Sequence, residues 1–150
     1  MAETAAQQAA VPIRVVDGTA DALPGPDAGM DAAVASLVLC SVPDQARALA
    51  ELRRVLRPGG ELRFFEHIQA DTSGLARAQR LADVIWPIFV GGCHTSRDTL
   101  TAITTAGFQL ISTHRFRFPD SRLPSPAAPH VLGIARRPPE SRPEGRHRID

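Results

Sequence analysis

The order of strand-like and helix-like segments between residues 32 and 67 constrains the fold more than any other feature of the chain. Residues 32–39 (Ala-Ala-Val-Ala-Ser-Leu-Val-Leu) are nearly all apolar, which is typical of a parallel strand covered on both faces. Asp44 then has the side chain of a helix N-cap, apolar residues recur after it at helical spacing, and Arg-Pro-Gly-Gly at 57–60 ends the helix. Residues 62–67 form the next predicted strand. This order predicts an α/β fold with parallel pairing.

Further helices and strands are predicted on both sides of this unit. In chain order they are a helix over residues 2–10, a strand over 13–16, a loop over 17–30, a helix over 73–89 that bends or breaks near Pro87, a helix opened by Thr95 and Asp98 and ended by Gly107, and strands over 108–118 and 130–135. The Arg/Pro/Glu-rich end cannot bury a core. We therefore expect one domain over residues 1–135 and a disordered tail over 136–150.

Composition excludes several classes of protein. The net charge of +1 gives no strong field for nucleic acid, so we expect no nucleic-acid partner. All of the basic side chains are arginines, and the absence of lysine excludes Schiff-base and P-loop lysine chemistry. Two cysteines without a secretory signal predict no disulfide framework, and no apolar run approaches the length of a transmembrane helix. A reducing cytoplasm is the expected location.

Two motifs resemble those of class I methyltransferases that depend on S-adenosylmethionine (SAM). Residues 18–24 (Gly-Thr-Ala-Asp-Ala-Leu-Pro) resemble the family's loop after the third strand, and residues 52–60 (Leu-Arg-Arg-Val-Leu-Arg-Pro-Gly-Gly) resemble its turn from helix to fifth strand. The resemblance covers roughly residues 5–136. It implies a Rossmann-like sheet and an enzyme with SAM as its cofactor.

Shorter motifs resemble one subfamily, the alkyl-thiol S-methyltransferases of the methyltransferase-like group. They are Leu-Val-Leu-Cys-Ser-Val at 37–42, Phe-Glu-His at 65–67, Gly-Cys-His-Thr at 92–95 and Pro-His-Val at 129–131. This resemblance implies methyl transfer to a small-molecule acceptor, in particular a thiol, by the full-length parent protein.

Two elements of the family pattern are missing ahead of Ile13. These are the Gly-rich turn after the first strand and the acidic residue that ends the second strand and binds the ribose. We therefore expect a sheet truncated at its N-terminal side, without the first two strands, and weak or absent SAM binding by this chain alone. In the family's strand order, 3-2-1-4-5-7-6, residues 13–16 would lose their neighbours and residues 32–39 would form an open edge. The alternative function is a non-catalytic half-domain that pairs with another chain through that edge.

The resemblance also assigns candidate cofactor-binding residues. Gly18, Thr19 and Ala20 would border the adenine, although an ordinary turn would have the same sequence. Thr19 stands where relatives commonly place an acidic residue, and its hydroxyl is a weaker acceptor for the adenine amino group. Leu39 and Cys40 would flank the methionine half of SAM, although Cys40 is equally suited to a place in the core as a small hydrophobic residue.

The candidate catalytic residues are Glu66 and His67, at the end of the second strand of the unit. Open α/β sheets bind ligands at this edge, so His67 is the leading candidate for a general base toward a thiol, against the alternative of a merely hydrogen-bonded histidine. Cys93 and His94 follow a Gly-Gly break and precede a helix, which suits a lid on the acceptor pocket, a nucleophile of a Cys-His hydrolase or a pair of metal ligands. The sequence does not cluster the three or four ligands that zinc needs, so no metal site is expected.

Overall fold

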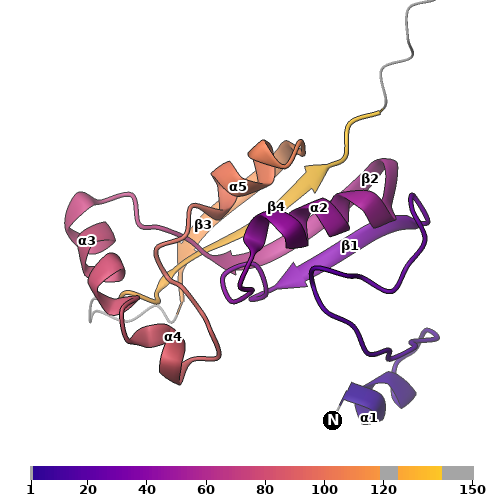
Figure 1. Cartoon of the computed structure of the whole chain (residues 1–150), viewed down its shortest axis with the longest axis horizontal. Coiled ribbons are helices and arrows are strands. Elements are labelled where there is room, and N and C mark those ends of the chain that lie inside the picture. The colour runs from indigo at the N-terminus through magenta and orange to yellow at the C-terminus, as the bar shows by residue number, and fades with distance from the viewer. Residues whose placement is uncertain (1, 119–124, 140–150) are drawn as a thin grey trace, which may run out of the picture.

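The computed structural model describes residues 2–118 and 125–139. In chain order the elements are α1 (Ala2–Gln7), β1 (Met30–Ser36), α2 (Gln45–Val55), β2 (Leu56–His67), α3 (Ser73–Ala82), α4 (Trp86–Phe89), α5 (Thr99–Thr105), β3 (Gln109–Arg117) and β4 (Pro129–Arg136). Figure 1 shows a single sheet with α2 and α5 lying along it, α3 and α4 at one end, and α1 apart from the sheet. None of the described helices has the length and apolar character needed to cross a membrane.

The strand order of the sheet is β1-β2-β4-β3. β1 pairs in parallel with β2, so that Ala32 lies opposite Glu61 and Ser36 lies opposite Phe65. β4 lies between β2 and β3 and is antiparallel to both. This arrangement corresponds to strands 4-5-7-6 of the family's sheet order, which confirms the predicted Rossmann-like α/β class.

The helix α2 connects the two parallel strands and covers one face of the sheet. Asp44 caps its N-terminus as predicted, because the Asp44 carboxylate accepts a hydrogen bond of 3.0 Å from the Arg47 N–H. The α2 residue Leu49 packs in a core whose other fully buried large apolar members are Leu39, Leu56, Leu62, Phe64, Ile103 and Val131. Full burial of each such side chain contributes about 1.5–3 kcal/mol relative to exposure. The core therefore lies between the sheet and the layer formed by α2 and α5.

Part of the opposite face of the sheet is exposed in the described part of the chain. Val34 of β1 is 75% exposed and Leu132 of β4 is 53% exposed. The prediction that residues 32–39 form a strand covered on both faces is therefore wrong, because only alternate residues such as Ala35 point toward the core. The strand also ends earlier than predicted, since Leu37 has a positive φ of 55° and turns the chain away from β1.

The predicted strand over residues 13–16 is absent from the structure. These residues form an irregular segment, in which Ile13, Val15 and Val16 are exposed. A strand forms only when its backbone groups pair with a neighbour, and none of the described strands pairs with residues 13–16. The expectation that residues 13–16 would lack neighbours and that β1 would lie at an edge of the sheet agrees with this arrangement.

The loop that follows this segment is anchored to α2 by charged side chains. Glu51 accepts a hydrogen bond of 2.9 Å from the Leu23 N–H, and Arg54 donates to the carbonyl oxygens of Leu23 and Gly25. Glu51 and Arg54 also pair with each other at 2.8 Å. These contacts hold residues 23–25 against α2.

The predicted helix over residues 73–89 is two helices, with the break at residues 83–85 just before Pro87. Asp83 ends α3, and its carboxylate accepts hydrogen bonds from the backbone and hydroxyl groups of Thr95 and Ser96. Thr95 therefore does not open the next helix as predicted; Asp98 alone caps α5. Burial by itself would raise the pKa of Asp83, but these hydrogen bonds outweigh it and hold the pKa below its ordinary value.

The segment after α3 is more exposed than its apolar sequence suggests. Ile88 and Phe89 of α4 are 76% and 80% exposed, so they do not pack in the core. Inside the same region, the fully buried Gln79 of α3 accepts a hydrogen bond from the Ala70 N–H and donates to the carbonyl oxygens of Ile68 and Thr95. Gln79 thus joins α3 to the chain segments on both sides of it.

β4 extends slightly beyond its predicted bounds. Its last residue is Arg136, and Arg137 is largely buried, with hydrogen bonds from its guanidinium to the carbonyl oxygens of Arg53 and Leu56. Arg136 and Arg137 therefore belong to the folded domain and not to the predicted tail. Residues 140–150 of that tail, and residues 119–124 between the last two predicted strands, lie outside the described residues.

Candidate active site

The loop over residues 37–42, which follows β1, is the centre of the candidate site. Glu66 of β2 is fully buried, and one of its carboxylate oxygens accepts hydrogen bonds of 2.9 Å from the N–H groups of both Val38 and Leu39. Its other oxygen accepts a hydrogen bond of 3.1 Å from the Cys40 N–H. Both oxygens are thus occupied by backbone donors, an arrangement that suits positioning of the loop better than proton transfer.

The carbonyl groups of the same loop are held from the other side. Arg97 donates hydrogen bonds of 2.8 Å to the carbonyl oxygens of Leu39 and Val42, and the His94 N–H donates at 2.8 Å to that of Cys40. Gly92 has a φ of +81°, and a Cβ placed on it would lie 2.9 Å from the Ser41 carbonyl oxygen, so only glycine fits there. The loop after β1 and the loop after α4 are therefore packed tightly together.

A cavity of about 370 Å³ lies on one side of the loop over residues 37–42. Gly18, Thr19, Ala20 and Leu39 all line it, together with Val38 and several apolar residues of β1 and α2. The structure therefore brings together four of the five residues that the resemblance assigned to cofactor binding. The fifth, Cys40, follows Leu39 directly but contributes its side chain to the other side of the loop.

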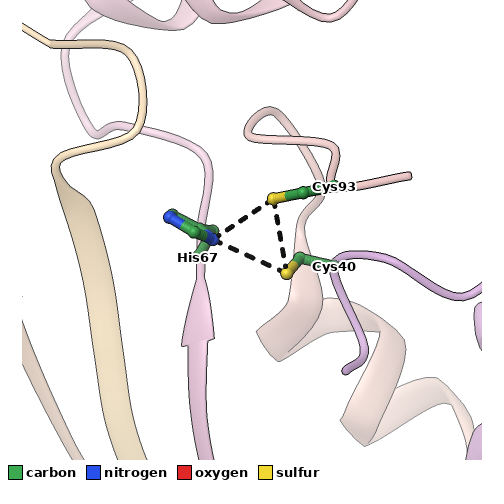
Figure 2. A group of neighbouring side chains, drawn as sticks. All are labelled: Cys40, His67 and Cys93. Carbon is green, nitrogen blue, oxygen red and sulfur yellow. Dashed lines mark hydrogen bonds between the residues drawn. The ribbon is translucent and has the colours of Figure 1, made fainter. Parts of the chain in front are cut away.

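On that other side, Cys40 meets His67 and Cys93 (Figure 2). Their sulfur and nitrogen atoms form a triangle: Cys40 Sγ lies 3.6 Å from Cys93 Sγ and 3.6 Å from His67 Nδ1, and Cys93 Sγ lies 3.4 Å from His67 Nδ1. We call these three residues the Cys-Cys-His cluster. Both cysteines are buried and are free thiols, whereas His67 is partly exposed.

The two thiols of the cluster differ in acidity. The hydrogen bond with Cys93, followed by burial, raises the pKa of Cys40 far above its ordinary value. The same contact lowers the pKa of Cys93, and burial only partly opposes this effect. Cys93 is thus the more readily ionised sulfur of the cluster.

An aromatic group continues from His67 along the sheet. The rings of His67 and His130 have centroids 4.3 Å apart, and His130 in turn stacks on Phe65 and Phe116. His130 Nδ1 lies 2.9 Å from the Ala128 carbonyl oxygen, so this nitrogen is the protonated one. Burial lowers the pKa of His130 and so favours the neutral form of the ring. A second cavity of about 230 Å³ is lined in part by His130, Phe116 and Ile68.

Two residues of this region are not among the predicted catalytic or cofactor-binding residues. The sequence suits Cys93 to a lid, a nucleophile or a metal ligand, and its separation of 53 residues from Cys40 gives no indication of the contact between their sulfurs. His130 has no predicted role beyond its place in a motif. The usable signal was that each lies in a motif of the subfamily, Gly-Cys-His-Thr at 92–95 and Pro-His-Val at 129–131. His94 is not in the cluster, since its ring lies 3.9 Å from Asp83 instead.

The described residues fit part of a SAM molecule. The cavity beside residues 18–20 is apolar and borders Leu39, as an adenine pocket next to the methionine half would require. Thr19 is exposed, and its hydroxyl hydrogen-bonds Asp21, which lowers the pKa of Asp21. Gly18 is the first glycine in the sequence, so the described residues ahead of it offer no counterpart of the Gly-rich turn.

Comparison with known proteins supports the resemblance. The family model "Methyltransferase domain" matches residues 1–64. Human "Thiol S-methyltransferase TMT1A" is 36% identical over 110 residues, which are 73% of this chain and 44% of that protein. "Ubiquinone/menaquinone biosynthesis C-methyltransferase UbiE" of Methylobacterium nodulans is 43% identical over 75 residues, 50% of this chain and 30% of that protein. The chain thus spans less than half of the curated relatives it matches.

A solved structure supports the same conclusion for the fold. A SAM-dependent methyltransferase from Methanosarcina mazei superimposes with a TM-score of 0.66 at 24% identity, over 93% of this chain and 76% of that one. Its fold agrees with the β1-β2-β4-β3 sheet and the crossover helix α2 described above. Motifs, strand order and relatives agree, and the chain belongs to the class I SAM-dependent methyltransferases.

Proposed function

We propose that this chain carries the acceptor side and part of the cofactor side of an enzyme that transfers a methyl group from SAM to a small thiol. The observation that carries the proposal is the place of two consecutive residues. Leu39 lines the cavity beside residues 18–20, and Cys40 belongs to the Cys-Cys-His cluster on the other side of the same loop. In-line transfer needs the methyl carbon and the sulfur nucleophile in direct contact, so we place the methionine half of SAM where Leu39 and Cys40 join the two sides of the loop.

On the cofactor side, we assign Gly18, Thr19 and Ala20 to the adenine and Leu39 and Cys40 to the methionine half. SAM, when bound, supplies a methyl group on a positively charged sulfur that is open to in-line displacement. The protein has to orient the two reactants and exclude water. The hydrogen bonds from Glu66 and Arg97 to the loop over residues 37–42 fix the position of Leu39 and Cys40, which supports this role.

On the acceptor side, we propose that His67 activates the thiol and that Glu66 positions the loop without taking part in proton transfer. The cavity beside His130 and Phe116 would receive the acceptor, since His130 contacts the ring of His67 and apolar and polar residues both line the cavity. A thiol is favoured as the acceptor because the human relative is named a thiol S-methyltransferase. The chain also matches a C-methyltransferase over a shorter stretch, so a carbon acceptor is the main alternative to a thiol.

The test is a transfer assay with the full chain and SAM that carries an isotopically labelled methyl group. Small alkyl and aryl thiols would be compared with the alcohols and amines of the same carbon skeleton, and the products would be identified by mass spectrometry. We expect labelled methyl thioethers from the thiols and no labelled product from the alcohols or amines. Labelling of the oxygen or nitrogen analogues at a comparable rate would refute the thiol assignment.

A matched pair of variants tests the cofactor side separately. Ala20 lines the cavity whereas Ala22, two residues later in the same loop, does not. We expect Ala20→Leu to fill the cavity and weaken SAM binding about tenfold or more, a loss of about 1.4 kcal/mol, while Ala22→Leu has little effect. Calorimetry also measures the affinity of the unmodified chain, which we expect to be weak. Micromolar binding would contradict that expectation, and equal binding by both variants would show that the cavity is not the adenine site.

A second candidate function is pairing with another chain that adds a strand to β1. It is favoured by the edge position of β1, where Val34 is exposed and β2 occupies the other side. Sedimentation at increasing protein concentration would measure association, and Val34→Lys would be the variant that disfavours it. A monomer at all concentrations would exclude pairing between copies of this chain.

We also propose a reducing cytoplasm as the location of the protein. Cys40 and Cys93 are free thiols with their sulfurs 3.6 Å apart, and a reducing compartment keeps such a pair from oxidising. Fractionation of cells that express the tagged protein would test this location, and recovery from an oxidising compartment would contradict it.

A further inference from the structure

The Cys-Cys-His cluster contains the ligand types of a metal site, on three separate segments. Cys40 comes from the loop after β1, His67 from the end of β2 and Cys93 from the loop after α4 (Figure 2). Two thiolates and one imidazole nitrogen are the ligand set that suits Zn²⁺, and the same set occurs in catalytic zinc sites. Neither the family match nor the names of the relatives mention a metal.

The distances within the cluster fit a tetrahedral metal ion. Zn–S bonds of about 2.3 Å and Zn–N bonds of about 2.0–2.1 Å at tetrahedral angles place two sulfurs about 3.8 Å apart and a sulfur and a nitrogen about 3.6 Å apart. The corresponding distances are 3.6 Å between the sulfurs, and 3.6 Å and 3.4 Å from the sulfurs to His67 Nδ1. A metal ion would therefore enter the cluster with shifts of only a few tenths of an ångström.

The backbone around the cluster is fixed, as a metal site requires. The Cys40 N–H donates to Glu66, and the Cys40 carbonyl accepts from the His94 N–H, which follows Cys93. The loop that carries Cys93 is bound at Thr95 and Ser96 by the Asp83 carboxylate. The His67 carbonyl accepts from the Thr99 hydroxyl at 3.3 Å. These contacts fix the backbone at and beside the three ligand residues before any ion binds, which lowers the cost of binding it.

Three protein ligands leave one tetrahedral position for another group. Structural zinc sites have four protein ligands, whereas catalytic sites have three and bind water or substrate at the fourth position. Among the described residues, no fourth Cys, His, Asp or Glu belongs to the cluster. The His67 ring also contacts His130, one of the residues that line the cavity assigned to the acceptor.

We propose that Cys40, His67 and Cys93 bind a Zn²⁺ ion whose fourth ligand is the sulfur of the methyl acceptor. This inference rests on the proposed function and specifies how the thiol is activated: His67 acts as a ligand and the metal ion, not the imidazole, promotes loss of the thiol proton. Binding of Zn²⁺ releases the protons of Cys40 and Cys93 to solvent, and coordination of the acceptor thiol releases its proton as well.

The methyl transfer itself is balanced. The thiolate sulfur attacks the methyl carbon, the new S–CH₃ bond forms as the bond from that carbon to the sulfonium sulfur breaks, and the bonding pair goes to the sulfonium sulfur. SAM thereby becomes neutral S-adenosylhomocysteine, and the acceptor becomes a thioether. A thioether carries no charge and is a much weaker zinc ligand than a thiolate, so the product leaves the metal.

The first experiment measures metal binding without any methyl transfer. The reduced full chain is loaded with Zn²⁺, freed of loosely bound ions and analysed for metal content, and Co²⁺ serves as a spectroscopic substitute with tetrahedral and thiolate absorption bands. We expect one ion per chain, and affinity reduced at least tenfold in Cys40→Ser, Cys93→Ser and His67→Asn. The matched control is His94→Asn, next to Cys93 in sequence but outside the cluster, which should bind normally.

A measurement on the unmodified chain guards against variants that fail to fold. Zn²⁺ should protect Cys40 and Cys93 from alkylation, as read by mass spectrometry, and a chelator should remove the protection. Absence of stoichiometric metal from the reduced chain, or equal alkylation with and without Zn²⁺, would overturn the proposal. The proposal would also be overturned if, in reducing buffer, Cys40 and Cys93 formed a disulfide in preference to binding the metal. That result would identify the two cysteines as a redox site.

The second experiment tests the open ligand position. A small alkyl thiol added to the Co²⁺-loaded chain without SAM should strengthen the thiolate-to-cobalt absorption, and the alcohol of the same skeleton should leave it unchanged. An unchanged spectrum would refute coordination of the acceptor. This experiment involves no methyl transfer, so it separates the two proposals. If the thiol changes the spectrum but the chain methylates no thiol, the proposed function is wrong and the metal site stands. If the metal-free chain methylates thiols, the proposed function stands and the role of the metal is wrong.

Discussion

Replacement of Glu66 by glutamine tests whether the buried carboxylate organises the candidate active site. In the wild type, three backbone N–H groups donate to the two carboxylate oxygens at 2.9–3.1 Å. Glutamine can keep its oxygen on Val38 and Leu39, but its NH₂ group must then face the Cys40 N–H, where two donors meet. One charge-assisted hydrogen bond, worth about 1.5–3 kcal/mol, is lost, and the other two lose the charge of their acceptor.

A neutral amide is easier to bury than a carboxylate, which offsets part of this loss. We therefore expect the Glu66→Gln variant to lower the free energy of unfolding by about 2 kcal/mol. Urea unfolding followed by circular dichroism measures this change. Amide hydrogen exchange locates it, because the protection of Val38, Leu39 and Cys40 should fall more than that of the core of β2.

The control is Glu61→Gln on the same strand. Glu61 pairs with Arg63 and Arg136 near the surface, and such pairs contribute little to stability. We expect a smaller change in this variant and no change in exchange at residues 38–40. If Glu66→Gln were as stable as the wild type and kept full protection of the three amides, the carboxylate would not be what holds this loop.

Three further predictions concern the scaffold of the site. Gln79→Leu keeps the side-chain volume but leaves the Ala70 N–H and the carbonyls of Ile68 and Thr95 without the Gln79 amide as partner. Urea unfolding should therefore show that the free energy of unfolding falls by about 2–4 kcal/mol, and a fall below about 0.5 kcal/mol would contradict this. Gly133→Ala places a Cβ 2.4 Å from the ring of Phe64, which it faces across β2 and β4, and should cost about 1–3 kcal/mol; wild-type stability would show that the ring can move away. The folded-state pKa of Asp83 lies below its ordinary value. The ionised Asp83 side chain therefore makes its full contribution to the free energy of unfolding above about pH 4, and this contribution is lost as the pH falls through the folded-state pKa. Asp83→Asn should therefore be less stable than the wild type at pH 7, with a difference that narrows below about pH 4, and a difference that stays constant down to pH 2 would refute this assignment.

Local sequence was sufficient for the elements that depend on short-range interactions. Asp44 caps α2 because its carboxylate reaches an N–H three residues later, and Gly107 ends the helix α5 region with a φ of +85°. The alternation of strand and helix between residues 30 and 67 follows from apolar spacing and turn residues. Resemblance of two short motifs then identified the family and, with it, the strand order.

Long-range contacts decided what local pattern could not. The apolar sequence of residues 32–39 suggested burial on both faces, yet Val34 is exposed, because burial depends on which elements pack beside a strand and not on its own composition. Residues 13–16 have strand-forming side chains but form no strand, since hydrogen-bonded pairing requires a neighbour.

The candidate site shows the same division. The sequence determined that Glu66 and His67 end a strand, that Cys40 follows another and that Cys93 follows a Gly-Gly break. Only the tertiary structure decided that both oxygens of Glu66 are used by the backbone of residues 38–40 and that the sulfur of Cys93 meets that of Cys40. The residues joined by these contacts are separated by 26 to 53 positions in the chain. Such contacts arise only when the edge of the sheet packs against the loop after α4.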